Sequence, residues 1–338
     1  MQTLLLSVSA TFVAALLNGS APPIGMIDYY GLKAVSREQL QEALQIEEGD
    51  PPPSSKEEAI ARLEKVPGVQ KAHLAIVCCD SGKTILFLGI QEKGSPVFEF
   101  RPAPQGTAKL SADILRDGAA LKEALAKAVL KGDVAEDHSK GHALSANPEM
   151  RPIQERFIMY AAVSFDELRT VLRTSPDSSH RALAAEVLGY AANKQMAAKI
   201  LLHGLNDPAP EVRNNCMRAL VAIAEFGRRY PRERIRIAPA LFVDLLHSLE
   251  WSDRNKAAAA LRSLTETRDS EILALLDKRA RDSLEEMAHW KSSTHAFDAF
   301  VLLARINGVP ESEIKERWNG NPDRRTFSLR RLRSATGN

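Results

Sequence analysis

Between residues 26 and 94, the hydrophobic and polar positions predict three strands and two helices in the order β-α-α-β-β. Each expected helix starts at a capping box, in which a serine precedes Gln or Glu by three residues. The two boxes are Ser36 with Gln39 and Ser55 with Glu58. The strands are expected at residues 27–30, 69–79 and 84–91. The pattern therefore predicts a small α/β domain.

From residue 151 to residue 320 the apolar positions follow a helical period, and the pattern itself repeats. Four helical segments align, and they begin at Arg181, Arg213, Arg254 and His295. Their equivalent leucines, spaced by 32, 41 and 41 residues, are Leu188, Leu220, Leu261 and Leu302. Small side chains recur on the packing face, at Ala184, Ala185, Cys216, Ala219, Ala257 and Ala260. The repeat predicts stacked helical hairpins.

The second repeat carries three motif pairs, which are Asp207-Pro208, Val212-Arg213 and Ala219-Leu220. In these residues the chain resembles HEAT-type repeat proteins, including the variety named after phycobilin lyases. The resemblance implies an α-solenoid with a concave groove, and it implies no lyase activity because that name follows the repeat. The expected fold class is mainly α: an α-solenoid of HEAT-like helical hairpins preceded by the small β-α-α-β-β domain.

A second set of motif residues lies in the first domain, at Gly31, Gly49-Asp50, Leu63, Val66-Pro67-Gly68-Val69 and Glu92. These residues resemble those of a POTRA domain, the module found in front of outer-membrane assembly barrels and in some bacterial division proteins. The resemblance implies a periplasmic location and capture of a peptide at a sheet edge, where unpaired backbone groups accept an added strand. A purely structural domain is the alternative. The helical sequence that follows departs from the family, in which a barrel is expected.

The N-terminal segment is apolar from residue 4 to residue 17, and the first charged residue is Asp28. This run is shorter than the stretch of about 20 apolar residues that a membrane-spanning helix needs, and it fits the core of a secretory signal peptide. Small residues around Ala21 suit a cleavage site, although Pro22 follows directly. We therefore expect a signal peptide at 1–21 and an exported protein, periplasmic or secreted. A buried N-terminal helix is the alternative.

The composition fits a folded protein, because 44% of the 338 residues are hydrophobic. Three cysteines are too few for a disulfide framework. Cys78 and Cys79 are neighbours in an expected strand, so we expect their side chains to point to opposite faces as two small buried thiols. Cys216 occupies an inward helical position, and we expect it to be buried as well.

Residues 95–150 are expected to form a linker that contains one helix, from Ala120 to Leu130. Asp137, His138 and His142 follow it, and two histidines four residues apart on a helix could bind a metal ion. Gly141 lies between the histidines, so a capped turn is the main prediction. An enzyme of unknown type, with metal-assisted chemistry at this segment, is the alternative function.

The net charge of +2 conceals an uneven distribution. Residues 27–100 carry 8 basic and 12 acidic side chains, a net charge of −4, whereas residues 151–338 carry 30 and 24, a net charge of +6. Two clusters hold the excess: Arg228, Arg229, Arg232, Arg234 and Arg236 in an insertion, and Arg324, Arg325, Arg330 and Arg331 near the C-terminus. Guanidinium groups suit carboxylates and phosphates. A solvated loop and a frayed tail are the alternative interpretation.

The expected partners are one or more proteins with an acidic or extended segment, or an anionic membrane surface. Nucleic acid is the least expected partner for an exported protein, and the sequence identifies no small-molecule substrate and no cofactor. We found no nucleophile elbow, phosphate-binding glycine loop, zinc-protease helix or CxxC motif, so we expect no enzyme activity. The sequence predicts an exported interaction scaffold, with a role in envelope assembly. Its expected parts are a signal peptide at 1–21, the POTRA-like domain at 26–94, the linker at 95–150, the HEAT-like repeats at 151–320 and a basic tail at 321–338.

Overall fold

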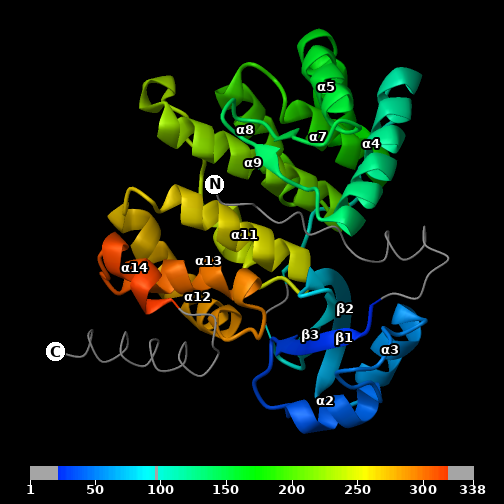
Figure 1. Ribbon diagram of the computed structural model, residues 1–338, viewed down its shortest axis with the longest axis vertical. Helices are drawn as coiled ribbons and strands as arrows, with labels where there is room; N and C mark the ends of the chain where they lie inside the picture. The colour runs from blue at the N-terminus through cyan, green and yellow to red at the C-terminus, as the bar shows by residue number, and fades with distance from the viewer. Residues whose placement is uncertain (1–21, 96–97, 319–338) are drawn as a thin grey trace. The chain divides into compact units, whose positions relative to one another are not determined.

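The computed structural model describes residues 22–95 and 98–318 of the chain (Figure 1). The predicted signal peptide and the arginines of the basic tail lie outside these residues. Contacts divide the described chain into two compact units. One unit comprises residues 99–242, and the other combines residues 22–95 and 98 with residues 243–318. These units are defined by contacts in space. The domains expected from the sequence were instead consecutive stretches of the chain, separated by whether they contain strands or only helices. Among the described residues, no helix has both the length and the apolar character that a membrane crossing requires.

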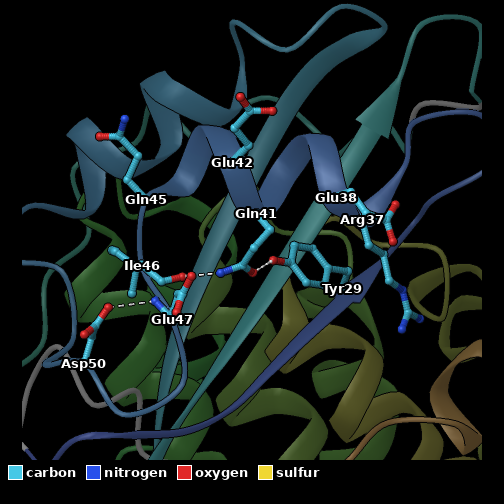
Figure 2. Close-up of a pocket in the computed structure, with 9 residues that line it drawn as sticks. All are labelled: Tyr29, Arg37, Glu38, Gln41, Glu42, Gln45, Ile46, Glu47 and Asp50. Atoms are coloured by element: carbon cyan, nitrogen blue, oxygen red, sulfur yellow. Dashed lines mark hydrogen bonds between the residues drawn. The ribbon is translucent and has the colours of Figure 1, made fainter.

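The segment up to residue 95 has the predicted β-α-α-β-β order. Its elements are β1 (Ile24–Tyr30), α2 (Arg37–Leu44), α3 (Lys56–Leu63), β2 (Val69–Asp80) and β3 (Lys83–Glu92). Both expected serine caps are present, because Ser36 Oγ accepts from the Gln39 backbone and Ser55 Oγ accepts from the Glu58 backbone. In the helix that Ser36 caps, α2, the Gln41 side chain accepts a hydrogen bond from the hydroxyl of Tyr29 in β1 (Figure 2). Local capping and one long-range bond thus fix α2 beside the sheet.

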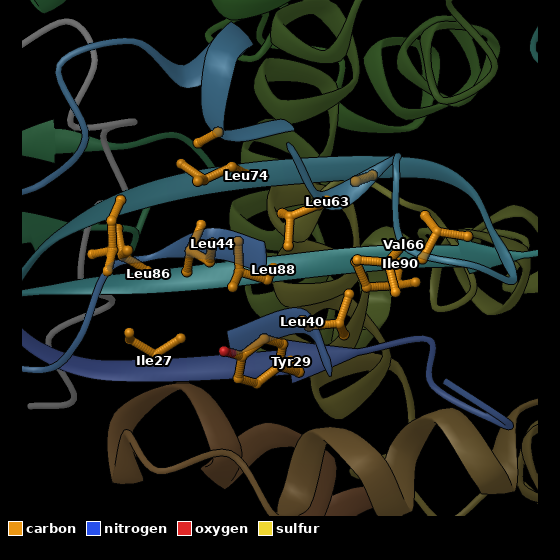
Figure 3. Packing of buried hydrophobic residues seen from close by; sticks show 14 of the residues in the cluster. Ile27, Tyr29, Leu40, Leu44, Leu63, Val66, Leu74, Leu86, Leu88 and Ile90 are labelled. Atoms are coloured by element: carbon orange, nitrogen blue, oxygen red, sulfur yellow. The ribbon is translucent and has the colours of Figure 1, made fainter. Parts of the chain in front are cut away.

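The three strands form one sheet in the order β1-β3-β2. The central strand β3 runs parallel to β1 and antiparallel to β2. Alternate side chains, such as Leu86, Leu88 and Ile90, point toward α2 and α3 and form a buried core with Leu40, Leu44 and Leu63 (Figure 3). The amphipathic stripes of both helices are therefore buried against one face of the sheet.

The opposite face of the sheet packs on helices from the C-terminal part of the same unit. Phe87 of β3 is fully buried, with ring centroids 4.9 Å from Trp251 and 5.0 Å from Trp290. The Tyr30 hydroxyl donates to the Leu249 carbonyl, and Glu286 accepts from the Gly31 backbone. Both faces of β3 are therefore covered, which is consistent with a sequence that is apolar along nearly the whole strand.

The helices that supply this second layer are α11 (Trp251–Leu264), α12 (Ser270–Ala288) and α13 (Ser293–Ile306), followed by α14 (Glu311–Arg317). A short helix, α10 (Ala240–Leu245), lies where the chain passes from one unit to the other.

Residues 99–242 form a mostly helical unit (Figure 1). Its helices are α4 (Ala112–Lys131), α5 (Arg151–Val163), α6 (Phe165–Thr174), α7 (Ser178–Leu188), α8 (Lys194–Gly204) and α9 (Pro210–Arg229). The expected helix of the linker is α4, and it begins at Ala112 instead of Ala120. The expected turn with the two histidines contains two short paired strands, β4 (Glu136–Asp137) and β5 (Leu144–Ser145).

An arginine with the same hydrogen bonds recurs in three repeats. Arg181, Arg213 and Arg254 each donate to the carbonyl of the residue six positions earlier, which is Ser175, Asp207 or Ser248. The side chains of those three residues in turn accept from the backbone two positions later. These bonds fix the turn that precedes each helix, so the sequence period of 32 and 41 residues is also a structural period.

The expectation of two buried thiols at Cys78 and Cys79 is wrong. The two sulfurs form a disulfide, Cys78 is half-buried and Cys79 is exposed. The regular pairing of β2 with β3 is interrupted between Val77 and Asp80. The two cysteines therefore leave the strict alternation of faces on which the expectation was based. Cys216 is fully buried, as expected.

Candidate functional site

The predicted arginine cluster lies at the C-terminal end of α9 and in the segment that follows. Arg228 and Arg229 form the last turn of the helix, where positive charge is favoured by the helix dipole. All five arginines are exposed, and Arg232 lies in the short 3₁₀ helix η1 (Pro231–Glu233). We call residues 228–236 the arginine loop. Arg324, Arg325, Arg330 and Arg331 lie outside the described residues.

The arginine loop is held to α8 by its backbone. Gln195 Oε1 accepts from the Arg236 backbone N–H at 2.7 Å, and Gln195 Nε2 donates to the Arg236 carbonyl at 3.3 Å. A Cβ at Gly227 would lie 3.1 Å from the Cβ of Ile235, so the glycine allows the loop to fold closely against the helix. These contacts position the loop backbone, and all five arginine residues remain exposed.

Two exposed apolar side chains accompany the loop. Tyr230 is 45% exposed and packs on Phe226 with a centroid distance of 4.7 Å. Met196, also 45% exposed, follows Gln195 in the first turn of α8. Arginine, tyrosine and methionine are the residue types enriched at protein interfaces. The loop therefore combines exposed cations, whose charge complements carboxylate and phosphate groups, with exposed apolar groups.

The residues of the alternative metal site have separate partners. His138 contacts Glu225 at 3.0 Å and Glu136 at 3.5 Å, through different ring nitrogens. His142 contacts the ammonium group of Lys194 at 3.1 Å, and Asp137 accepts from the backbone and hydroxyl of Ser139. Within residues 22–95 and 98–318, no three His, Cys, Asp or Glu side chains are grouped so that they could hold a metal ion.

The two histidines have opposite shifts in pKa. Burial disfavours the charged form of His138, but its hydrogen bonds to Glu136 and Glu225 outweigh that effect and raise its pKa to about 9. Burial lowers the pKa of His142 to about 4, and the charge of Lys194 acts in the same direction. At neutral pH, one ring is therefore an imidazolium in an ion pair and the other is neutral.

Arg218 of α9 connects the β4–β5 hairpin to the repeat helices. It pairs with Glu136 and lies 3.5 Å from Glu186 of α7. Next to it, a cavity of 20 Å³ is lined by His142, Tyr190 and Arg218, which is room for about one water molecule. The ionic groups of this region thus fix the hairpin to the helices, and the cavity is too small for an organic substrate.

An open hollow of 740 Å³ lies on the other unit, between α2 and the loop that follows it (Figure 2). Its charged lining residues are Arg37, Glu38, Glu42, Glu47 and Asp50. Within it, Gln41 donates to the Ile46 carbonyl and Asp50 accepts from the Glu47 backbone. Four of these five side chains are acidic, so the hollow would favour cations over anions.

The sheet edge predicted to capture a peptide is only partly accessible. Along β2, Gln70, Lys71 and Cys79 are exposed, whereas the residues from Leu74 to Val77 are buried. The Ala72 backbone N–H points outward and donates to Glu64. On β1, the backbone N–H of Ile27 donates to Glu48.

Sequence reasoning missed Gln195, which anchors the arginine loop, and Arg218 with Glu225, which connect α9 to the hairpin. Their partners are distant in the sequence, 41 residues for Gln195 and 82 for Arg218. The hydrophobic period places these polar residues on helices, but it does not indicate which partner each one meets.

Comparison with protein families identifies a repeat family in the region of α6 to α9. A model of HEAT repeats matches residues 165–235, which extend from α6 through α9 to the arginine loop. No curated protein matches the chain. The match, together with the mainly helical structure, identifies HEAT-type repeats in this region.

Proposed function

We propose that this HEAT-repeat chain is an exported interaction scaffold that binds an acidic, extended segment of a partner protein through the arginine loop. HEAT repeats in general support protein–protein interaction, and the matched residues include most of the loop. The setting we propose is a bacterial envelope, where the chain assists assembly. The observation that carries this proposal is the anchored loop with five exposed arginines.

The charge and the anchoring of the loop support binding of an anionic segment. Glu233 is its single acidic residue, so the loop has an excess of four positive charges, five minus one. The two hydrogen bonds between the Gln195 side chain and the Arg236 backbone, one donated by each residue, hold the loop in place before a partner binds. Preorganisation lowers the entropy lost on binding, and exposed Tyr230 and Met196 add apolar contact area.

The N-terminal segment supports the finer parts of the proposal. Its β-α-α-β-β order is that expected of a POTRA-like domain, and the family resemblance implies a periplasmic protein. Disulfides form most readily in oxidising compartments outside the cytosol, and Cys78 and Cys79 form one. Peptide capture at the edge of β2 would begin at the exposed residues Gln70 and Lys71.

The test is a comparison of two charge-reversal variants of the full chain. One carries Arg232→Glu, Arg234→Glu and Arg236→Glu in the loop. The matched control carries Arg116→Glu, Arg151→Glu and Arg169→Glu, which are exposed arginines on α4, α5 and α6. Both variants change the charge equally. Binding of a fluorescent peptide rich in glutamate is measured at low and high salt, followed by pull-down from an envelope fraction.

We expect the loop variant to lose binding of the acidic peptide and of any protein that wild type and control both retain. Binding by the wild type should weaken as salt rises, because the contacts are solvent-exposed ion pairs. Equal loss in both variants would show a general charge effect and contradict the loop proposal. Binding to anionic vesicles without binding to the peptide would replace the protein partner by a membrane surface.

A further inference from the structure

The disulfide between Cys78 and Cys79 takes no part in the proposed binding of an acidic segment by the arginine loop. It joins residues that are adjacent in the sequence. A disulfide stabilises a fold mainly by closing a loop in the unfolded chain, and this effect grows with the length of the loop. With no residue between the two cysteines, that contribution is the smallest a disulfide can have. Stabilisation of the fold therefore does not account for this bond.

The bond is open to attack from one side. Cys79 is exposed, whereas Cys78 is half-buried and packs against the core between the sheet and its two helices. A thiolate from solvent therefore reaches the sulfur of Cys79 first. The third cysteine, Cys216, is fully buried, and burial raises its pKa, which keeps it as an unreactive thiol.

The position of the bond in β2 connects it to structure on both sides. It lies where strand pairing is interrupted, between the pairs Val77–Ile85 and Asp80–Lys83. Immediately after it, Asp80 accepts a hydrogen bond at 3.0 Å from Ser292, a fully buried residue at the start of α13. The two sulfurs therefore lie next to the tip of the hairpin and next to its contact with the start of α13.

We propose that Cys78 and Cys79 form an exchangeable redox pair that takes two electrons from a dithiol. A thiolate of the dithiol attacks Cys79 Sγ, the bond between the cysteines breaks, and Cys78 Sγ leaves as a thiolate that takes up a proton. The second thiolate of the dithiol then attacks its own sulfur in the mixed disulfide and releases Cys79 as a thiol. The dithiol becomes a disulfide, and the protein gains two electrons and two protons.

Reduction also changes which side-chain directions are open to Cys78 and Cys79 in β2. Neighbouring side chains in a regular strand point to opposite faces, and the bond between the two sulfurs prevents this. In the reduced protein, Cys78 can stay on the core face while Cys79 turns away from it. The pairing between Val77 and Asp80 then becomes free to rearrange, so the hairpin tip has two redox-dependent states.

The test uses the full chain, purified in air, with dithiothreitol as the dithiol. Intact mass and labelling with iodoacetamide under native conditions are measured before and after reduction, and amide hydrogen exchange is followed across residues 77–84. We expect a mass gain of two hydrogens, two newly labelled cysteines assigned to positions 78 and 79, and faster exchange confined to the hairpin tip and the start of α13. The control is the double variant Cys78→Ser and Cys79→Ser, which should not respond to dithiothreitol.

Two results would overturn the proposal. Labelling of both cysteines in the untreated protein would show that the pair is not a disulfide. Resistance to dithiothreitol at concentrations that reduce an exposed reference disulfide would show that it is not exchangeable. Both measurements are made on the wild-type chain, so they do not depend on the folding of a variant, and neither depends on the binding of an acidic partner.

Discussion

At the scale of the residue, the arginine in the first turn of three repeat helices (α7, α9 and α11) is the clearest determinant of the fold. Arg181 is 1% exposed and donates to both carboxylate oxygens of Asp207 as well as to the Ser175 carbonyl. Buried charges are costly unless they are paired and hydrogen-bonded. One side chain therefore joins the turn before its own helix to the turn of the next repeat.

Replacement of Arg181 by alanine should destabilise the chain by about 3 kcal/mol, because breaking a buried ion pair leaves groups without their partner. Urea unfolding followed by far-UV circular dichroism measures this loss. The control is Arg169→Ala, since Arg169 is exposed and pairs with Asp166 in its own helix. It should change the free energy of unfolding by less than about 0.5 kcal/mol. Equal effects would contradict the structural role of Arg181.

His138 predicts a dependence of stability on pH. Its pKa is raised from 6.5 to about 9 in the folded protein. The stabilisation is therefore complete below pH 6.5, where the ring is charged in both states, and it is lost as pH rises through 9. The difference in unfolding free energy between wild type and His138→Gln should fall by on the order of 3 kcal/mol across that window.

His142 gives the opposite pH dependence and serves as the control for the same measurement. Its pKa is lowered to about 4, so folding favours the neutral ring. Its contribution is complete above pH 6.5 and is lost as pH falls toward 4. The difference between wild type and His142→Gln should therefore change only on the acid side. A flat difference for His138→Gln between pH 6.5 and 9 would contradict its ion pairs with Glu136 and Glu225.

At the scale of the element, the helix starts separate into those with a side-chain cap and those without one. Ser36 and Gln39 form a complete capping box at α2. Ser111 occupies the same position at α4, but its side chain makes no capping hydrogen bond. The same residue type at the same position thus has different energetic roles, because only one of the two side chains meets a backbone N–H.

Ser36→Ala should destabilise the protein by about 1 kcal/mol, which is the typical value for loss of a serine cap. Ser111→Ala should have little effect, since no bond is lost. Thermal unfolding of the two variants beside the wild type measures both values. If the two substitutions shift the midpoint equally, the cap at α2 has no special role in stability.

At the scale of the whole molecule, the sheet is completed by helices that follow it by more than 150 residues. Phe87 contacts Trp251 and Trp290, and all three tryptophans of the chain, including Trp318, belong to the unit that contains the sheet. Tryptophan fluorescence therefore reports on this unit. The N-terminal segment and the C-terminal helices share one core.

Phe87→Ala should destabilise this unit by about 3–5 kcal/mol, because it leaves a cavity between the sheet and the helices. The loss should appear as a lower midpoint of urea unfolding when unfolding is followed by tryptophan fluorescence. The substitution is in an N-terminal strand, whereas the tryptophans lie in the C-terminal part of the unit. Lys71→Ala, at an exposed position of β2, is the control and should shift the midpoint little. An unchanged midpoint for Phe87→Ala would contradict a shared core.

Local patterns in the sequence determined the elements of this protein. The serine caps at 36 and 55, the β-α-α-β-β order and the repeated arginines are encoded within a few residues of where they act, because helical and strand periods are local properties of the chain. The same reasoning placed five arginines in an insertion after a repeat helix, and the structure has them exposed.

Only the tertiary structure decided which elements meet. The pattern of β3 indicates a strand buried on both faces, but it does not identify Trp251 and Trp290 as the covering residues. The anchoring of the arginine loop by Gln195 and the disulfide at Cys78 likewise depend on side chains brought together by folding. Hydrophobic periodicity specifies that a face is buried, whereas the partner is selected by packing between distant segments, which a local pattern does not encode.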